Sequence, residues 1–98
     1  MTEAQFSVED DTVGPIVIAS GQLDMAVNDA LRDVLAGLDG VVTVDLSNVT
    51  FIDSSAIGVF VGAQSRLTDA GGRLRLRNPQ DLPRRVLEIV GFGEWIER

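Results

Sequence analysis

The sequence predicts an α/β fold with a mixed, mainly parallel sheet, an N-terminal hairpin and helices packed on one face of the sheet. Two observations lead to this fold class. Strand-like and helix-like segments alternate along the 98 residues after the opening hairpin, which is the pattern of right-handed βα crossovers. The run Arg73–Arg77 alternates strictly between arginine and leucine, so we expect one face of this strand in water and the other beneath helices. The length is that of one domain, residues 1–98, with a single modest core.

The first half of the chain is expected to form two strands, a helix and a third strand. Phe6–Glu9 alternates in polarity, and turn residues separate it from an apolar strand at Ile16–Ala19, which together predict a hairpin. A loop, Gly21–Asp24, ends on the expected N-cap of a helix over Met25–Leu38, where apolar residues recur at steps of three and four. Val41–Asp45 is the expected third strand, and a short polar loop follows it.

The second half of the chain is expected to add two helices and two strands. A helix runs over Ser54–Ala70 and ends at a pair of glycines. Arg73–Arg77 is the fourth strand, and an Asn-Pro pair then turns the chain. The last helix, Leu82–Val90, has a proline near its first turn and a glycine past its end, and Trp95-Ile96 is expected as a short final strand.

The segment Thr50–Gly62 carries the strongest functional signal, because Asp53 and Ser54 fall at the start of the predicted helix. Serine and aspartate are favoured there, since their side-chain oxygens accept hydrogen bonds from amides that have no partner in the first turn. One interpretation is therefore a capped core helix that follows a strand. The functional interpretation is a phosphate-bearing position, because two adjacent hydroxyls, Ser54 and Ser55, lie where the helix dipole and free amides favour a phosphate.

The same helix is expected to have two different faces at about 100° per residue. The inward face is expected to hold Ile57, Phe60, Val61, Gln64 and Leu67. The outward face is expected to hold Ser54, Ser55, Gly58, Gly62, Arg66 and Asp69. This outward face is polar at both ends and nearly bare in the middle, which would allow the backbone of another protein to approach closely. The alternative is that the two glycines only permit tight packing within the domain.

Composition excludes several classes of function. The chain has no cysteine and no histidine, which rules out disulfides, His/Cys metal sites and Ser-His-Asp or Cys-His nucleophiles. Residues 1–53 hold ten acidic residues and one basic residue, and the whole chain has a net charge of −7, so neither nucleic acid nor a membrane is an expected partner. No apolar run is long enough to span a bilayer, and the N-terminus lacks the pattern of a signal peptide, so a cytoplasmic location is expected.

Three carboxylates, Asp24, Asp45 and Asp53, are expected near the ends of strands and could cluster there. Such a cluster could bind Mg²⁺, although protein sites for this ion usually use substrate phosphates as well. The interpretation we favour is that the three residues cap helices and shape loops. A Gly-rich phosphate loop is also missing, because no lysine is present to complete it, so we predict no cofactor and no metal site.

Two motifs resemble a known family. Asp-Ser-Ser-Ala-Ile-Gly-Val at residues 53–59 resembles the Asp-Ser-Ser/Thr-Gly-Leu-Gly signature of bacterial anti-sigma factor antagonists, the single-domain members of the STAS family. Gly-Gln-Leu-Asp at residues 21–24 resembles that family's Gly-Glu-Leu-Asp, and the resemblance spans nearly the whole chain in the same order and spacing. The chain departs from the pattern at Gln22, Ala56 and Ile57, and the alanine in place of glycine could stiffen the helix start or alter the choice of partner.

The resemblance implies a one-sided βα superhelix with a mixed sheet, and a protein that switches partners. The unphosphorylated chain would bind an anti-sigma factor that is also a serine kinase, and would thereby free the sigma factor. The kinase would phosphorylate Ser54 with its own ATP and Mg²⁺, and a separate metal-dependent serine phosphatase would remove the phosphate. The chain itself would perform no catalysis. The residues expected to bind the partner are Asp24, Asp53, Ser54, Ser55, Gly58, Gly62 and Arg66.

Two alternatives belong to other classes of function. One is a STAS module that is not phosphorylated and serves as a ligand-binding or scaffold subunit in a lipid-transport or stress-sensing assembly. The other is a small enzyme that uses acidic residues, which would need a metal ion and a substrate pocket.

Overall fold

A computed structural model describes residues 4–97, which form a mixed sheet with helices in the connections between its parallel strands. In these residues five strands lie in chain order across the sheet. They are β1 (Gln5–Asp10), β2 (Pro15–Leu23), β3 (Val41–Ile52), β4 (Arg73–Arg77) and β5 (Ile96–Glu97). The helices are α1 (Asn28–Ala36), α2 (Ser54–Asp69) and α3 (Asp81–Ile89), with short 3-10 helices η1 (Met25–Val27) and η2 (Gly93–Trp95). Only β1 and β2 pair antiparallel, so the predicted hairpin and mainly parallel sheet are confirmed.

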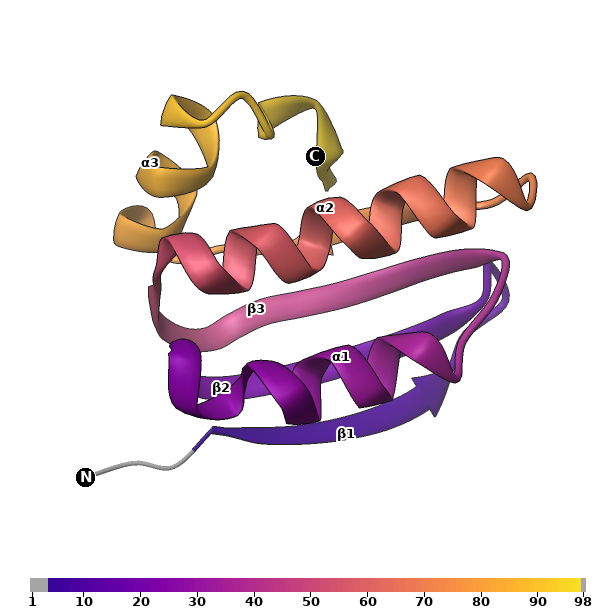
Figure 1. The fold of residues 1–98 in the computed structure, drawn as a ribbon, viewed down its shortest axis with the longest axis horizontal. Coiled ribbons are helices and arrows are strands. Elements are labelled where there is room, and N and C mark those ends of the chain that lie inside the picture. The colour runs from indigo at the N-terminus through magenta and orange to yellow at the C-terminus, as the bar shows by residue number, and fades with distance from the viewer. Residues whose placement is uncertain (1–3, 98) are drawn as a thin grey trace.

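The helices cover one face of the sheet, as the sequence predicts. Figure 1 shows α1 and α2 side by side in front of the sheet, with α3 beyond α2. Leu31 of α1, Leu67 of α2 and Leu87 of α3 are fully buried in the same core as the inward side chains of the strands. The three helices therefore share a single core with one face of the sheet.

The alternating strand β4 shows which face is covered. Leu74 and Leu76 are 1% and 0% exposed and belong to the core, whereas Arg73 is exposed. Arg75 and Arg77 lie on the same side as Arg73 and are half-buried. The prediction that the leucines lie beneath the helices is confirmed, because successive side chains of a strand point to opposite faces.

Two strands are longer than the sequence predicts. The expected loop at residues 21–24 is largely the end of β2, and the expected polar loop after Asp45 lies within β3. From the Ile18–Asp45 pair to the Leu23–Ile52 pair, β2 advances five residues and β3 advances seven, with register shifts at two places. Such bulges take up extra residues without ending the pairing. Pairing with a neighbouring strand thus outweighed the turn-like local composition.

The first helix is shorter than predicted and begins differently. Asp24 is an N-cap, as expected, but it caps the 3-10 turn η1, where the Ala26 amide donates to Asp24 Oδ1 at 3.0 Å. The α-helix proper begins at Asn28 and ends at Ala36.

Two further elements have the expected positions. The last helix begins one residue before the predicted start, and the short final strand pairs with β4 through Ile96 and Glu97. Within the part of the chain that the structure describes, no helix has both the length and the apolar character needed to cross a membrane.

Candidate functional site

The candidate site lies at the edge of the sheet where β2 and β3 end. Leu23 and Ile52 are paired at the ends of these strands, and the Asp53 amide donates to the Leu23 carbonyl oxygen at 3.1 Å. This bond brings the segment that begins with Asp24 next to the start of α2. Figure 1 shows the same arrangement, with the turn before α1 and the first turn of α2 at one end of the molecule.

Asp53 is the N-cap of α2, as the sequence predicts. One of its carboxylate oxygens, Oδ1, accepts hydrogen bonds from the amides of Ser55 at 2.9 Å and Ala56 at 3.0 Å, and also from the Ser55 hydroxyl. The Ser55 hydroxyl is the main cause that lowers the pKa of Asp53 below its ordinary value, helped by the amides of Ala56, Ser55 and Met25 and opposed by partial burial. Asp53 is therefore a carboxylate at neutral pH, and the start of the helix already holds a negative charge.

The two adjacent serines have different environments. Ser54 is the first residue of α2 and is exposed, and within residues 4–97 its hydroxyl makes no hydrogen bond. Ser55 is half-buried and its hydroxyl donates to Asp53. Of the two hydroxyls expected at this position, only that of Ser54 is both exposed and free to rotate. The sequence predicts the two hydroxyls side by side, and the hydrogen bond to Asp53 gives that of Ser55 a different environment from that of Ser54.

The outward face of α2 is open, and the alternative of tight packing at its glycines is wrong for the described residues. Gly58 and Gly62 are both exposed. A Cβ atom added to either residue would meet no atom within 4 Å apart from its chain neighbours and the backbone of its own helix. Neither glycine is therefore required for packing inside the part of the chain that the structure describes, and the middle of this face is bare, as predicted.

Val61 was predicted on the inward face but is 44% exposed. The buried arc of α2 instead includes Ala56, Val59 and Ala63. The reason is that α1 packs alongside α2, so the side chains that face α1 are covered in addition to those that face the sheet. Gln64 is partly buried as predicted, and its amide group exchanges hydrogen bonds with the Leu74 backbone at 2.7 and 3.3 Å.

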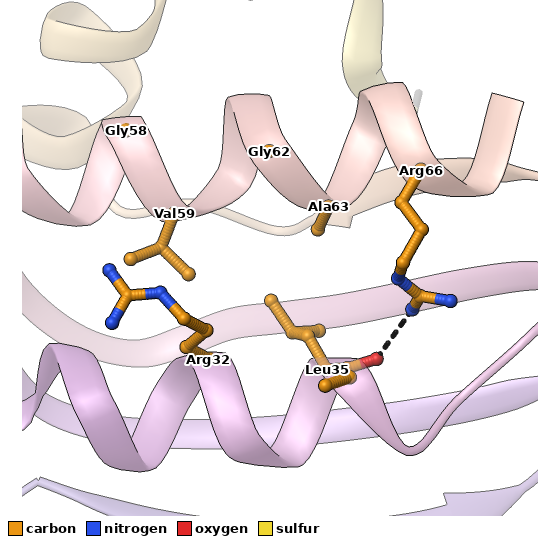
Figure 2. Close-up of a pocket in the computed structure, with 8 residues that line it drawn as sticks. Arg32, Leu35, Gly58, Val59, Gly62, Ala63 and Arg66 are labelled. Carbon is orange, nitrogen blue, oxygen red and sulfur yellow. Dashed lines mark hydrogen bonds between the residues drawn. The ribbon is translucent and has the colours of Figure 1, made fainter. Parts of the chain in front are cut away.

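A groove of about 270 Å³ lies between α1 and α2, beside the bare stretch of α2. It is lined by Arg32, Leu35, Ala36, Gly58, Val59, Gly62, Ala63 and Arg66. Figure 2 shows Arg32 and Arg66 at opposite ends, with Leu35, Val59 and Ala63 between them. Sequence reasoning found Gly58, Gly62 and Arg66 but missed the α1 side of this groove. Small residues on one flank of α2 were the only available signal, and they do not reveal which helix lies opposite.

Arg66 has a structural role that the sequence did not reveal. Its guanidinium donates to the carbonyl oxygens of Leu35 at 2.8 Å and Leu38 at 2.7 Å, and it pairs with Asp39 at 3.1 Å. The last turn of α1 contains no basic residue of its own. Arg66 therefore supplies the hydrogen-bond donors and the positive charge that the C-terminus of α1 needs.

The three carboxylates that could have formed a metal site each accept hydrogen bonds from residues close by in the sequence. Asp24 and Asp53 are caps, and Asp45 accepts hydrogen bonds from the Ser47 amide at 2.9 Å and the Ser47 hydroxyl at 2.6 Å. Among the described residues no three acidic side chains gather closely enough to hold a metal ion. The geometry gives no support to the Mg²⁺ alternative.

Comparison with known proteins relates this geometry to a family. Residues 6–97 match the family described as "Mlab, STAS domain". An anti-sigma F factor antagonist of Lysinibacillus sphaericus is 31% identical in an alignment 97 residues long, and the alignment covers 93% of this chain and 83% of that protein.

Two solved structures of the anti-sigma factor antagonist SpoIIAA have a similar fold. The unphosphorylated form is 24% identical, with a TM-score of 0.84 and coverage of 95% of this chain and 86% of that chain. The phosphorylated form from Bacillus is 25% identical, with a TM-score of 0.76 and coverage of 95% and 89%.

Proposed function

The chain belongs to the STAS domain family, and from this premise we propose that it is an anti-sigma factor antagonist that works by partner switching. In the unphosphorylated state the domain, residues 1–98, binds an anti-sigma factor that is also a serine kinase, and this binding frees the sigma factor. The kinase then phosphorylates Ser54, and the phosphorylated chain no longer binds. A serine phosphatase removes the phosphate and restores the first state.

The observation that carries this proposal is the exposed and unengaged hydroxyl of Ser54 at the start of a helix whose outward face is bare. A kinase must bring its ATP to the acceptor hydroxyl, which requires that the protein surface around this hydroxyl be accessible. Ser54, Gly58 and Gly62 lie on one exposed side of α2, and no side chain stands between them and a partner. Asp24, Asp53, Ser55 and Arg66 border this surface.

Phosphorylation is expected to release the partner through charge. A phosphoserine adds roughly −1.5 to −2 charges at pH 7. On Ser54 this charge lies beside the ionised carboxylate of Asp53 and near Asp24, in a chain whose net charge is already −7. In the free domain water solvates the phosphate, and the positive end of the helix dipole favours its charge. In the complex the phosphate must lose that water against a surface that fits a neutral hydroxyl, so the energetic cost falls on binding.

In this role the chain is a ligand and a substrate, with no catalysis of its own. ATP and Mg²⁺ belong to the kinase, and the phosphatase brings its own metal ions. A sigma factor acts on RNA polymerase in the bacterial cytoplasm, so the chain is expected to work there.

The test is incubation with a serine-kinase anti-sigma factor, ATP and Mg²⁺, followed by mass measurement. The wild-type chain should gain one phosphate, whereas Ser54→Ala should gain none and should still bind the kinase. A wild-type chain that binds no such kinase and takes no phosphate would instead favour the ligand-binding or scaffold role in a larger assembly.

A further inference from the structure

Ser54 and Ser55 lie at the same place on the surface that a kinase would approach, but their hydroxyls have different hydrogen bonds. Both hydroxyls belong to the first turn of α2 and are on adjacent residues, so proximity to a bound ATP does not by itself select between them. Their hydrogen bonds differ, however. The Ser55 hydroxyl donates a hydrogen bond to Asp53 Oδ1, whereas the Ser54 hydroxyl has no partner within residues 4–97.

Phosphoryl transfer places specific demands on the acceptor. The hydroxyl oxygen must lie in line with the γ-phosphate, and its proton must pass to a base of the kinase. The Ser54 hydroxyl can rotate to meet both demands. Ser55 must first break a hydrogen bond to an ionised carboxylate, which is stronger than a bond between neutral groups, and must then turn outward from a half-buried position.

We infer that Asp53 is a positioning residue that directs the phosphate to Ser54 by holding the Ser55 hydroxyl. The inference rests on the proposed function, because it needs a kinase that acts at this helix. In the selected reaction the Ser54 oxygen forms a bond to the γ-phosphorus of ATP while the bond from that phosphorus to ADP breaks. The proton of the Ser54 hydroxyl passes to the base of the kinase. Asp53 takes no proton and contacts no reacting atom.

Two features of the geometry support this role over that of a simple helix cap, and the ionisation of Asp53 agrees with them. The backbone amides of Ser55 and Ala56 already satisfy the capping requirement, at 2.9 and 3.0 Å from Asp53 Oδ1. The hydrogen bond from the Ser55 hydroxyl comes in addition to these. The lowered pKa of Asp53 keeps the carboxylate ionised at neutral pH, so the Ser55 hydroxyl remains its donor under the conditions of the reaction.

The experiment measures how phosphate is shared between Ser54 and Ser55, by fragment mass spectrometry after incubation with the kinase and ATP. Asp53→Ala removes the carboxylate that accepts the hydrogen bond from the Ser55 hydroxyl. The fraction of phosphate on Ser55 should then rise at least tenfold above that of the wild type. Asp53→Asn keeps an oxygen that can accept the hydrogen bond, but this oxygen is neutral and accepts more weakly, so the fraction of phosphate on Ser55 should lie between those of the wild type and Asp53→Ala. Asp24→Ala is the matched control, because it removes a neighbouring carboxylate that is bonded to the Ala26 amide and not to Ser55.

A second pair of variants leaves Asp53 in place. Ser54→Ala should remain unphosphorylated despite the adjacent hydroxyl, and Ser55→Ala should carry all of its phosphate on Ser54. Because neither change removes the helix cap, phosphate on Ser55 in Ser54→Ala would overturn the inference even if Asp53→Ala fails to fold.

The possible results distinguish failure of this inference from failure of the proposed function. Substantial phosphate on Ser55 in Ser54→Ala, or an unchanged distribution in folded Asp53→Ala, would overturn the inference and leave the proposed function intact. Loss of all phosphorylation in folded Asp53→Ala would also overturn it, because Asp53 would then be a residue that the kinase reads directly. Absence of phosphate from the wild-type chain would refute the proposed function itself.

Discussion

Replacement of Gly62 by arginine should separate binding from folding. Gly62 is exposed in the middle of α2, and a Cβ atom there would meet nothing within 4 Å apart from its chain neighbours and the backbone of its own helix, so a longer side chain can be accommodated without moving the helix. Glycine inside a helix is about 0.8–1 kcal/mol less favourable than alanine, and arginine is close to alanine. The variant should therefore gain about 0.5–1 kcal/mol in its free energy of unfolding. For a domain of this size this corresponds to a melting temperature higher by about 2–8 °C.

The same substitution should weaken binding to the kinase. A flexible charged side chain would occupy the surface that we assign to the partner's backbone, beside the groove that Arg32 and Arg66 flank. We expect a loss of more than tenfold in affinity, which is about 1.4 kcal/mol. Thermal unfolding followed by circular dichroism measures the change in melting temperature, and titration calorimetry with the kinase measures the change in affinity.

Gly62→Ala is the graded control for this pair of measurements. It should stabilise the domain by a similar amount and bind the kinase nearly as well as the wild type, because a methyl group adds little bulk. A melting temperature several degrees lower for Gly62→Arg would mean that Gly62 packs against part of the domain. Equal affinity of wild type and Gly62→Arg would place the interface on another face.

Three further predictions concern the surroundings of the site. Arg66→Ala removes hydrogen bonds to two carbonyl groups, so it should lower the free energy of unfolding by about 1–2 kcal/mol. It should also speed amide hydrogen exchange near the C-terminus of α1, and unchanged exchange there would argue against this capping role. Asp53 has a lowered pKa in the folded state, so its contribution to stability is complete above its unfolded pKa of about 3.9 and is lost as the pH falls through the folded value. Urea unfolding between about pH 5 and pH 2 should therefore show a smaller loss of stability in Asp53→Asn than in the wild type, and equal slopes would contradict the assignment. Phosphorylation of Ser54 should change backbone amide NMR shifts near Ser54 and Asp24 only, while affinity for the kinase falls by orders of magnitude; widespread shifts through α3 would indicate a conformational switch instead.

The sequence by itself determined those features that depend on near neighbours in the chain. The alternation of Arg73–Arg77 was enough to show which leucines lie beneath the helices, because a strand turns successive side chains to opposite faces. Asp53 was enough to place the start of α2, because a cap acts on the amides that directly follow it. The separate environment of Ser55 was also within reach of the sequence, since its hydroxyl bonds to a residue only two positions away.

Only the tertiary structure decided which sides of these elements are covered. Val61 is exposed and Val59 is buried because α1, far earlier in the chain, lies along one flank of α2. Arg66 caps α1 through a bond to Leu35, and 31 positions separate the two residues in sequence. The extra residues of β3 remain in the sheet because they pair with β2. Periodicity and capping are local properties of a segment, whereas burial and pairing depend on elements that only the folded chain brings together.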